Sequence, residues 1–124
     1  MNAYERLLKY VVIRTPSNEE SETTPSSQCQ FDLANVLKKE MEELGICDVT
    51  LTDTCFLYGK IPATPGCENA PALGLIAHMD TAPDASGDNI HPQIIENYDG
   101  KDVVLGTSGK TIKVEEFPYL ADLK

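Results

Sequence analysis

A histidine and an aspartate two residues apart form the clearest chemical candidate in the sequence. His78 and Asp80 directly follow an apolar run from Ala72 to Ala77. On an extended chain, residues two positions apart point to the same face. A neutral imidazole is a good zinc ligand, and a neighbouring carboxylate can orient the ring or tune the metal. The pair therefore suits metal binding or proton transfer.

Two interpretations of this pair remain open from residue chemistry alone. An H-x-D triplet arises often by chance, and a histidine at a strand end is commonly just a hydrogen-bonded core residue. The context favours a site, because a strand that is apolar throughout is typical of the middle of an α/β sheet. Ligands of such sheets bind beyond the carboxyl ends of the strands. Two more acids, Asp84 and Asp88, follow within ten residues.

Two other motifs that the sequence partly resembles lack residues that they require. The run from Gly106 to Thr111 resembles the end of a phosphate-binding loop, but Val104 stands where that motif needs glycine. A β-hairpin is the better interpretation. The acids at 80, 84 and 88 lack the alternating ligands, the glycine and the distal glutamate of a calcium-binding EF-hand. His91 precedes Pro92 in a polar stretch, and we expect it to be an exposed loop residue.

The length and composition of the chain exclude several classes of protein. The 124 residues could form one small domain, and the net charge of −10 disfavours nucleic acid and anionic membranes as partners. No apolar run is long enough to span a membrane, and the N-terminus does not have the pattern of a signal peptide. We therefore expect a soluble, cytoplasmic protein. The four cysteines contain no C-x-x-C pair, which favours reduced thiols over a disulfide framework or a zinc ribbon.

The elements that must position the pair can be predicted from periodicity and turn signals. Helical spacing of apolar residues predicts helices over residues 3–13 and 28–44. Ser27 with Gln30 resembles a capping box, and Gly45 is a fitting helix stop. The expected strands cover residues 48–52, 55–61 and 72–77, the last being central. Further along we expect a polar loop over 16–27, an extended segment over 91–98, a hairpin of strands 102–106 and 110–114, and the start of a helix at 117. This order predicts an α/β fold with a mixed sheet flanked by helices.

The run His-Met-Asp-Thr-Ala-Pro-Asp at 78–84, with the apolar residues before it, resembles the first metal motif of the M20 metallopeptidases. More narrowly it is similar to their tripeptide aminopeptidases, the peptidase T group. The likeness covers essentially the whole chain and includes Ser86-Gly87, Pro92-Gln93-Ile94, Glu96-Asn97-Tyr98 and Phe117-Pro118.

The resemblance implies a zinc-peptidase catalytic domain whose complete site holds two zinc ions. His78 would be a terminal ligand of one zinc, and Asp80 would orient or polarise that ligand. A water bridging the metals, activated by a glutamate, would attack the first peptide bond of a tripeptide. The implied partner is a small peptide substrate.

The sequence also departs from the family. The bridging aspartate in a Gly-Ala-Asp-Asp motif, the catalytic glutamate pair and the lid domain do not occur in it. We therefore expect residues 1–124 to be the N-terminal part of a catalytic domain, inactive alone and completed by the remainder of that domain. One alternative is a catalytically silent domain of the same fold that binds a ligand or partner. Another is an unrelated structural module, which a buried His78 remote from any cleft would favour.

Overall fold

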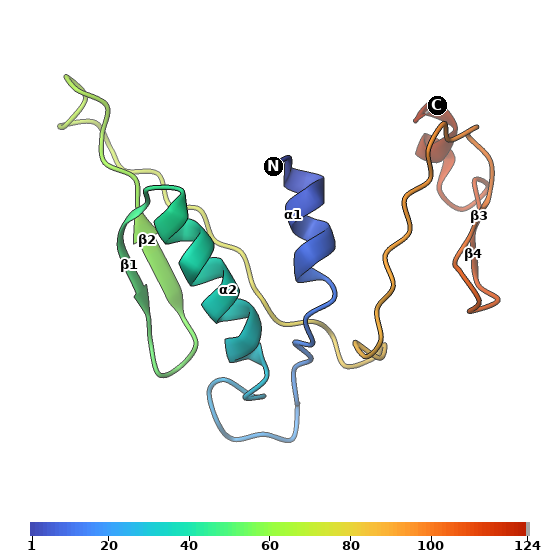
Figure 1. The fold of residues 1–124 in the computed structure, drawn as a ribbon, viewed down its shortest axis with the longest axis horizontal. Coiled ribbons are helices and arrows are strands. Elements are labelled where there is room, and N and C mark those ends of the chain that lie inside the picture. Colours follow the sequence, from blue (N-terminus) through green and yellow to red (C-terminus); the bar gives the residue numbers. More distant parts are fainter. Residues whose placement is uncertain (124) are drawn as a thin grey trace. The chain divides into compact units, whose positions relative to one another are not determined.

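The computed structural model describes residues 1–123, which divide into two compact units (Figure 1). The first covers residues 1–90, and the second begins at His91. Within the described residues, no helix has the length and apolar character needed to cross a membrane.

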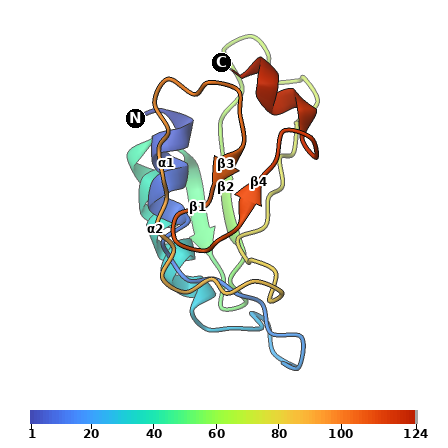
Figure 2. The same ribbon diagram turned by 90° about the vertical axis from the view of Figure 1, so that its right-hand side faces the viewer.

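A helix packed on a β-hairpin forms the best-packed part of the first unit. Helix α2 (Gln30–Glu43) lies against strands β1 (Cys47–Leu51) and β2 (Leu57–Lys60), as Figures 1 and 2 both show. The two strands are antiparallel, with Leu51 opposite Leu57. Along β1, Val49 and Leu51 are half-buried and Thr50 between them is exposed. The helix and both strands were predicted.

The C-terminal end of α2 was predicted correctly, and its N-terminal cap was not. Gly45 stops the helix at a φ of 78°, and the N–H of Ile46 donates to the carbonyl oxygen of Met41 at 3.0 Å. This left-handed glycine is the predicted C-terminal stop. The predicted capping box is wrong, because Cys29 rather than Ser27 precedes the helix and no side chain caps it. Ser27 instead accepts the Gln30 N–H through its backbone carbonyl at 3.2 Å.

The core of this unit is small. Its buried apolar residues are Leu33, Ala34 and Cys55. Contact between α2 and β2 is close at Gly59, where an added Cβ would lie 2.4 Å from Met41 Cε and 2.6 Å from Ile46 Cγ2. A side chain at this position would therefore push the helix end away from the strand.

Helix α1 (Ala3–Tyr10) ends three residues earlier than predicted. None of its residues is buried, and Tyr4 and Leu7 are each more than half exposed. Its apolar stripe is therefore not a buried core face among the described residues. An ion pair between Arg6 and Glu40, 2.6 Å apart, links α1 to α2. A cavity of about 580 Å³ lies between Leu7 of this stripe and Leu33 and Leu37 of α2.

The apolar run from Ala72 to Ala77 was predicted to be a buried central strand, and this prediction is wrong for the described residues. The run forms no strand, and Leu73, Leu75 and Ile76 are 85%, 88% and 101% exposed. The predicted mixed sheet is also absent there, since both sheets are two-stranded and antiparallel. A run of this composition is buried only when strands flank it and layers cover both faces. The described residues supply neither.

The second unit contains the predicted hairpin. Strands β3 (Val103–Val104) and β4 (Thr111–Ile112) pair antiparallel, and the Leu105 N–H donates to the Lys110 carbonyl at 2.9 Å. This hairpin confirms the choice against a phosphate-binding loop. The helix expected from residue 117 is a short 3-10 helix, η1 (Pro118–Asp122). Residues 91–98 form no strand, and His91 is exposed as predicted.

Substituting Gly59 tests the contact between α2 and β2. We expect Gly59→Ala to lower the free energy of unfolding by about 1–3 kcal/mol, because the new methyl overpacks against Ile46 and Met41. Gly74→Ala is the matched control, since no atom lies within 4 Å of the Cβ it would add. Chemical denaturation followed by far-UV circular dichroism measures both. Equal stability of the two variants would contradict the close contact.

Thiol reactivity tests the core at Cys55. All four cysteines are free, as predicted, with Cys55 buried and with Cys47 and Cys67 exposed. Burial raises the pKa of the Cys55 thiol. A raised pKa leaves less of the nucleophilic thiolate at neutral pH. Iodoacetamide should therefore modify Cys47 and Cys67 first and Cys55 last, as peptide mass spectrometry over time would record. Early modification of Cys55 would show that it is not buried in solution.

Candidate functional site

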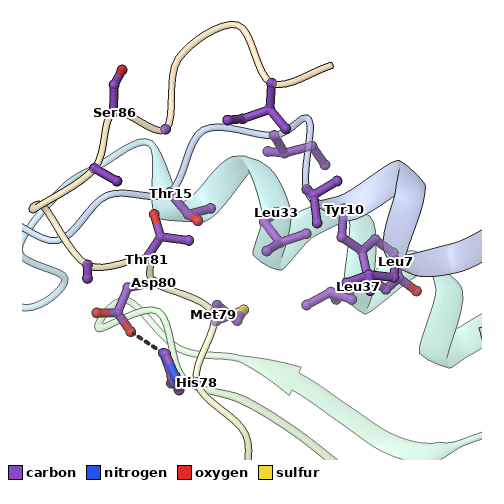
Figure 3. Close-up of a pocket in the computed structure, with 16 residues that line it drawn as sticks. Leu7, Tyr10, Thr15, Leu33, Leu37, His78, Met79, Asp80, Thr81 and Ser86 are labelled. Atoms are coloured by element: carbon purple, nitrogen blue, oxygen red, sulfur yellow. Dashed lines mark hydrogen bonds and ion pairs between the residues drawn. The ribbon is translucent and has the colours of Figure 1, made fainter. Parts of the chain in front are cut away.

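His78 and Asp80 lie in contact. Their Nδ1 and Oδ1 atoms are 3.1 Å apart (Figure 3), so the two side chains share a face as the spacing predicted. Met79 between them points the other way, toward the apolar residues of the helices (Figure 3). With Nδ1 protonated, the ring donates to Asp80 and its Nε2 lone pair stays free. Metal-ligating histidines usually have this arrangement, with one nitrogen on the metal and the other held by a carboxylate.

The pair is accessible. The His78 side chain is 83% exposed and that of Asp80 is 42% exposed. A core histidine held only for packing would be buried. The buried His78 that would have favoured an unrelated structural module is thus not found.

The described residues supply one corner of a metal site. Among residues 1–123, no group of three or more histidine, cysteine, aspartate or glutamate side chains could hold a metal ion. Asp88 pairs with Arg14 instead of converging on His78. A catalytic zinc ion needs about three protein ligands. The donor set therefore fits a single ligand with its orienting acid, and it does not fit a complete zinc site. The metal role of His78 stays a prediction.

A backbone bridge positions the chain directly after Asp80. The Thr81 N–H donates to the Thr15 carbonyl at 2.9 Å, and the Ser17 N–H donates to the Thr81 carbonyl at 3.0 Å. This is a parallel β-bridge between Pro16 and Thr81. Sequence reasoning missed it, because residues 15 to 17 resemble only a helix stop and the start of a loop.

An ion pair holds the same loop further along. Arg14 Nε donates to Asp88 Oδ1 at 2.5 Å, and Arg14 Nη1 lies 3.5 Å from Cys29 Sγ. The hydrogen bond and the negative charge of Asp88 raise the pKa of the Arg14 guanidinium. Both side chains are about half exposed, so the pair is a surface contact. No sequence pattern pointed to it, since the partners are far apart in the chain.

Two cavities flank the segment that carries the pair. One, of about 580 Å³, is lined by Leu7, Leu33 and Leu37 of the helices together with residues 78–82 and 85–87 (Figure 3). The other, of about 650 Å³, lies between residues 75–80 and residues 54–58. Both are hollows open to solvent, and Leu75 and Ile76 beside the second are 88% and 101% exposed. Residues 75 and 76 are therefore not packed within the first unit.

Known proteins resemble this chain over nearly its whole length. Peptidase T of Aliivibrio fischeri is 47% identical over 119 residues, which cover 96% of this chain and 29% of that protein. Peptidase T of Bacillus licheniformis is 45% identical over 119 residues, covering 95% of this chain and 29% of that protein. Peptidase T of Fusobacterium nucleatum is 46% identical over 117 residues, which cover 94% of this chain and 28% of that protein.

No family model matches the chain. The predicted resemblance to peptidase T is nevertheless confirmed by these relatives. The chain spans less than a third of the length of the curated relatives it matches.

Replacing the exposed pair should leave the fold intact. We expect His78→Ala and Asp80→Ala each to change the free energy of unfolding by less than about 0.5 kcal/mol, because exposed ion pairs and surface side chains contribute little. Chemical denaturation measures this change. A loss of several times that size in either variant would show that the pair serves the fold rather than a site.

Proposed function

We propose that this chain is the N-terminal part of the catalytic domain of a zinc-dependent aminopeptidase of the peptidase T kind. In this proposal His78 binds one of two zinc ions and Asp80 holds its imidazole. The observation that carries the proposal is the contact of Nδ1 with Asp80, which leaves Nε2 free in an exposed ring. The identity of 42–47% with peptidase T proteins supports it.

The pair has a defined task in such a site. Asp80 fixes the ring orientation and the tautomer of His78, and it makes the free nitrogen more basic. When bound, two zinc ions would activate a water and polarise the scissile carbonyl of the substrate. The remaining ligands and the general base belong to parts of the protein outside residues 1–123. The substrate we propose is a tripeptide, from which the enzyme releases the N-terminal residue.

The remainder of the same catalytic domain is the partner that we propose for the first unit. The stretch from Pro71 to Ala77 carries no charged side chain, and its large apolar residues are almost fully exposed. The two cavities described above border residues 78–80, which follow this stretch. Chain that corresponds to the other two thirds of the relatives' length would cover this surface. The first 124 residues alone would then be inactive.

A catalytically silent domain of the same fold is the second candidate. The observation that favours it is the lack of a complete metal-ligand set among residues 1–123. The coding sequence beyond Lys124 distinguishes the two candidates. A Gly-Ala-Asp-Asp motif followed by a glutamate pair supports the enzyme, and a stop codon supports the silent domain.

We also propose a cytoplasmic location. The four free thiols suit a reducing compartment, where structural disulfides are rare. The acidic composition disfavours nucleic acid and anionic membranes as partners.

Reconstitution tests the enzyme directly. The chain alone, supplied with zinc and a tripeptide, should show no turnover. Mixing it with the complementary part of Aliivibrio fischeri peptidase T should restore hydrolysis, because that part would supply the missing ligands and cover the apolar run. Amino-acid release is the measurement. Substantial zinc-dependent turnover by the chain alone would refute the inactivity that we propose.

The two histidines provide a matched pair of variants in the reconstituted enzyme. Asp80→Asn should lower activity about 10–100-fold, as loss of a carboxylate that orients a metal ligand does. His78→Ala should lower it further, and His91→Ala should leave it unchanged, since His91 is an exposed loop residue. The assay is turnover at saturating zinc. Equal effects of the two histidine substitutions would exclude His78 as the ligand.

A further inference from the structure

We propose that the segment from Arg14 to Ser17 positions the backbone at Thr81, directly after His78 and Asp80, and that the Arg14–Asp88 pair sets how firmly the following residues 82–87 are held. This inference rests on the proposed metal role of His78. The contacts that support this positioning role join residues more than sixty positions apart in the sequence.

The first attachment lies one residue from the candidate site. Thr81 follows Asp80 directly and is bonded through both its N–H and its carbonyl to the backbone on either side of Pro16. The Ser17 hydroxyl also donates to the Thr81 carbonyl, at 3.2 Å. Because three hydrogen bonds hold Thr81, the backbone leaving Asp80 has a fixed direction. The orientation of the Asp80 carboxylate, and through it that of the imidazole, depends on this bridge.

Proline suits the centre of the bridge. Thr81 bonds to Thr15 and Ser17, and Pro16 lies between these two residues. In a parallel pairing of this kind, the backbone N–H and C=O of the residue in Pro16's position point away from Thr81. Pro16 has no N–H to leave unpaired there. Its carbonyl accepts from Gln30 Nε2 at 3.4 Å. The bridge is thus tied to the first turn of α2.

The segment itself is anchored in the interior. Thr15 is 3% exposed and Gln30 is 8% exposed, which makes them the buried polar residues of the described chain. No buried side-chain nitrogen or oxygen among the described residues lacks a hydrogen-bond partner. The bridge therefore transmits the position of α2, the best-packed helix, to the chain at Asp80.

The second attachment closes the loop. Arg14 Nε donates to Asp88 Oδ1, so residues 82–87 are held at both ends against one short segment. Arg14 also contacts Cys29 Sγ next to α2. Exposed ion pairs contribute little to global stability. This pair can still limit how far the loop opens, because opening requires only local fluctuation.

Charge exchange tests the positioning role. Arg14→Glu and Asp88→Arg should each speed hydrogen exchange at the Thr81 amide by roughly two- to fivefold, because like charges then face each other across the loop. Each should also shift the nuclear magnetic resonance signals of the His78 ring. The double variant R14E/D88R should restore both readouts, since it rebuilds the pair in reverse.

The control variant breaks a similar pair elsewhere. Lys101→Glu removes the exposed ion pair between Lys101 and Asp99, which are 2.8 Å apart in the second unit. It should change neither the Thr81 exchange rate nor the His78 signals. Single variants that behave like this control, or a double variant that fails to restore the readouts, would overturn the proposal.

Zinc affinity in the reconstituted enzyme separates this inference from the proposed function. Arg14→Glu should weaken zinc binding by roughly two- to tenfold, less than the 10–100-fold loss typical when a residue contacting a metal ligand is removed. If the reconstituted enzyme binds zinc through His78 and Arg14→Glu leaves the affinity unchanged, the positioning role fails and the proposed function stands. If His78→Ala leaves zinc binding and turnover intact, the proposed function fails.

Discussion

Two backbone hydrogen bonds on either side of Pro16 hold together three parts of the first unit that are distant in the sequence. They join the end of the α1 region to Thr81, and the Pro16 carbonyl extends the connection to Gln30 at the start of α2. With so few apolar side chains buried, these polar contacts determine much of how residues 81–88 lie against residues 14–17. Polar contacts of this kind are specific in geometry, because a donor and an acceptor must both be placed correctly.

Local signals account for the parts of the structure that the sequence predicted well. Helix α2 with its glycine stop, the β1–β2 pair and the second hairpin all follow from periodicity and turn residues within a few positions. The contact of His78 with Asp80 also follows from local geometry, since alternate residues of an extended chain share a face. Each of these features involves residues near one another in the chain.

The errors come from features that depend on distant residues. The run from Ala72 to Ala77 has the composition of a covered strand, but composition cannot show which segments do the covering. Ser27 was assigned as a cap from its spacing to Gln30, whereas the Gln30 side chain instead contacts Pro16 and Ser26. The Pro16–Thr81 bridge spans 65 positions and leaves no pattern in either segment. For the same reason the candidate site was predicted as a pair, without the segment that holds it.

The exposed apolar run has a consequence for synthesis of a protein as long as the relatives. Chains grow at about 5–20 residues per second, so a segment near the start waits on the order of tens of seconds for the last part of such a protein. Throughout that interval Leu73, Leu75 and Ile76 present an uncharged apolar stretch to solvent. Large exposed apolar patches are aggregation liabilities in incompletely folded proteins. In such a protein this run would stay uncovered until the rest of the domain had been made.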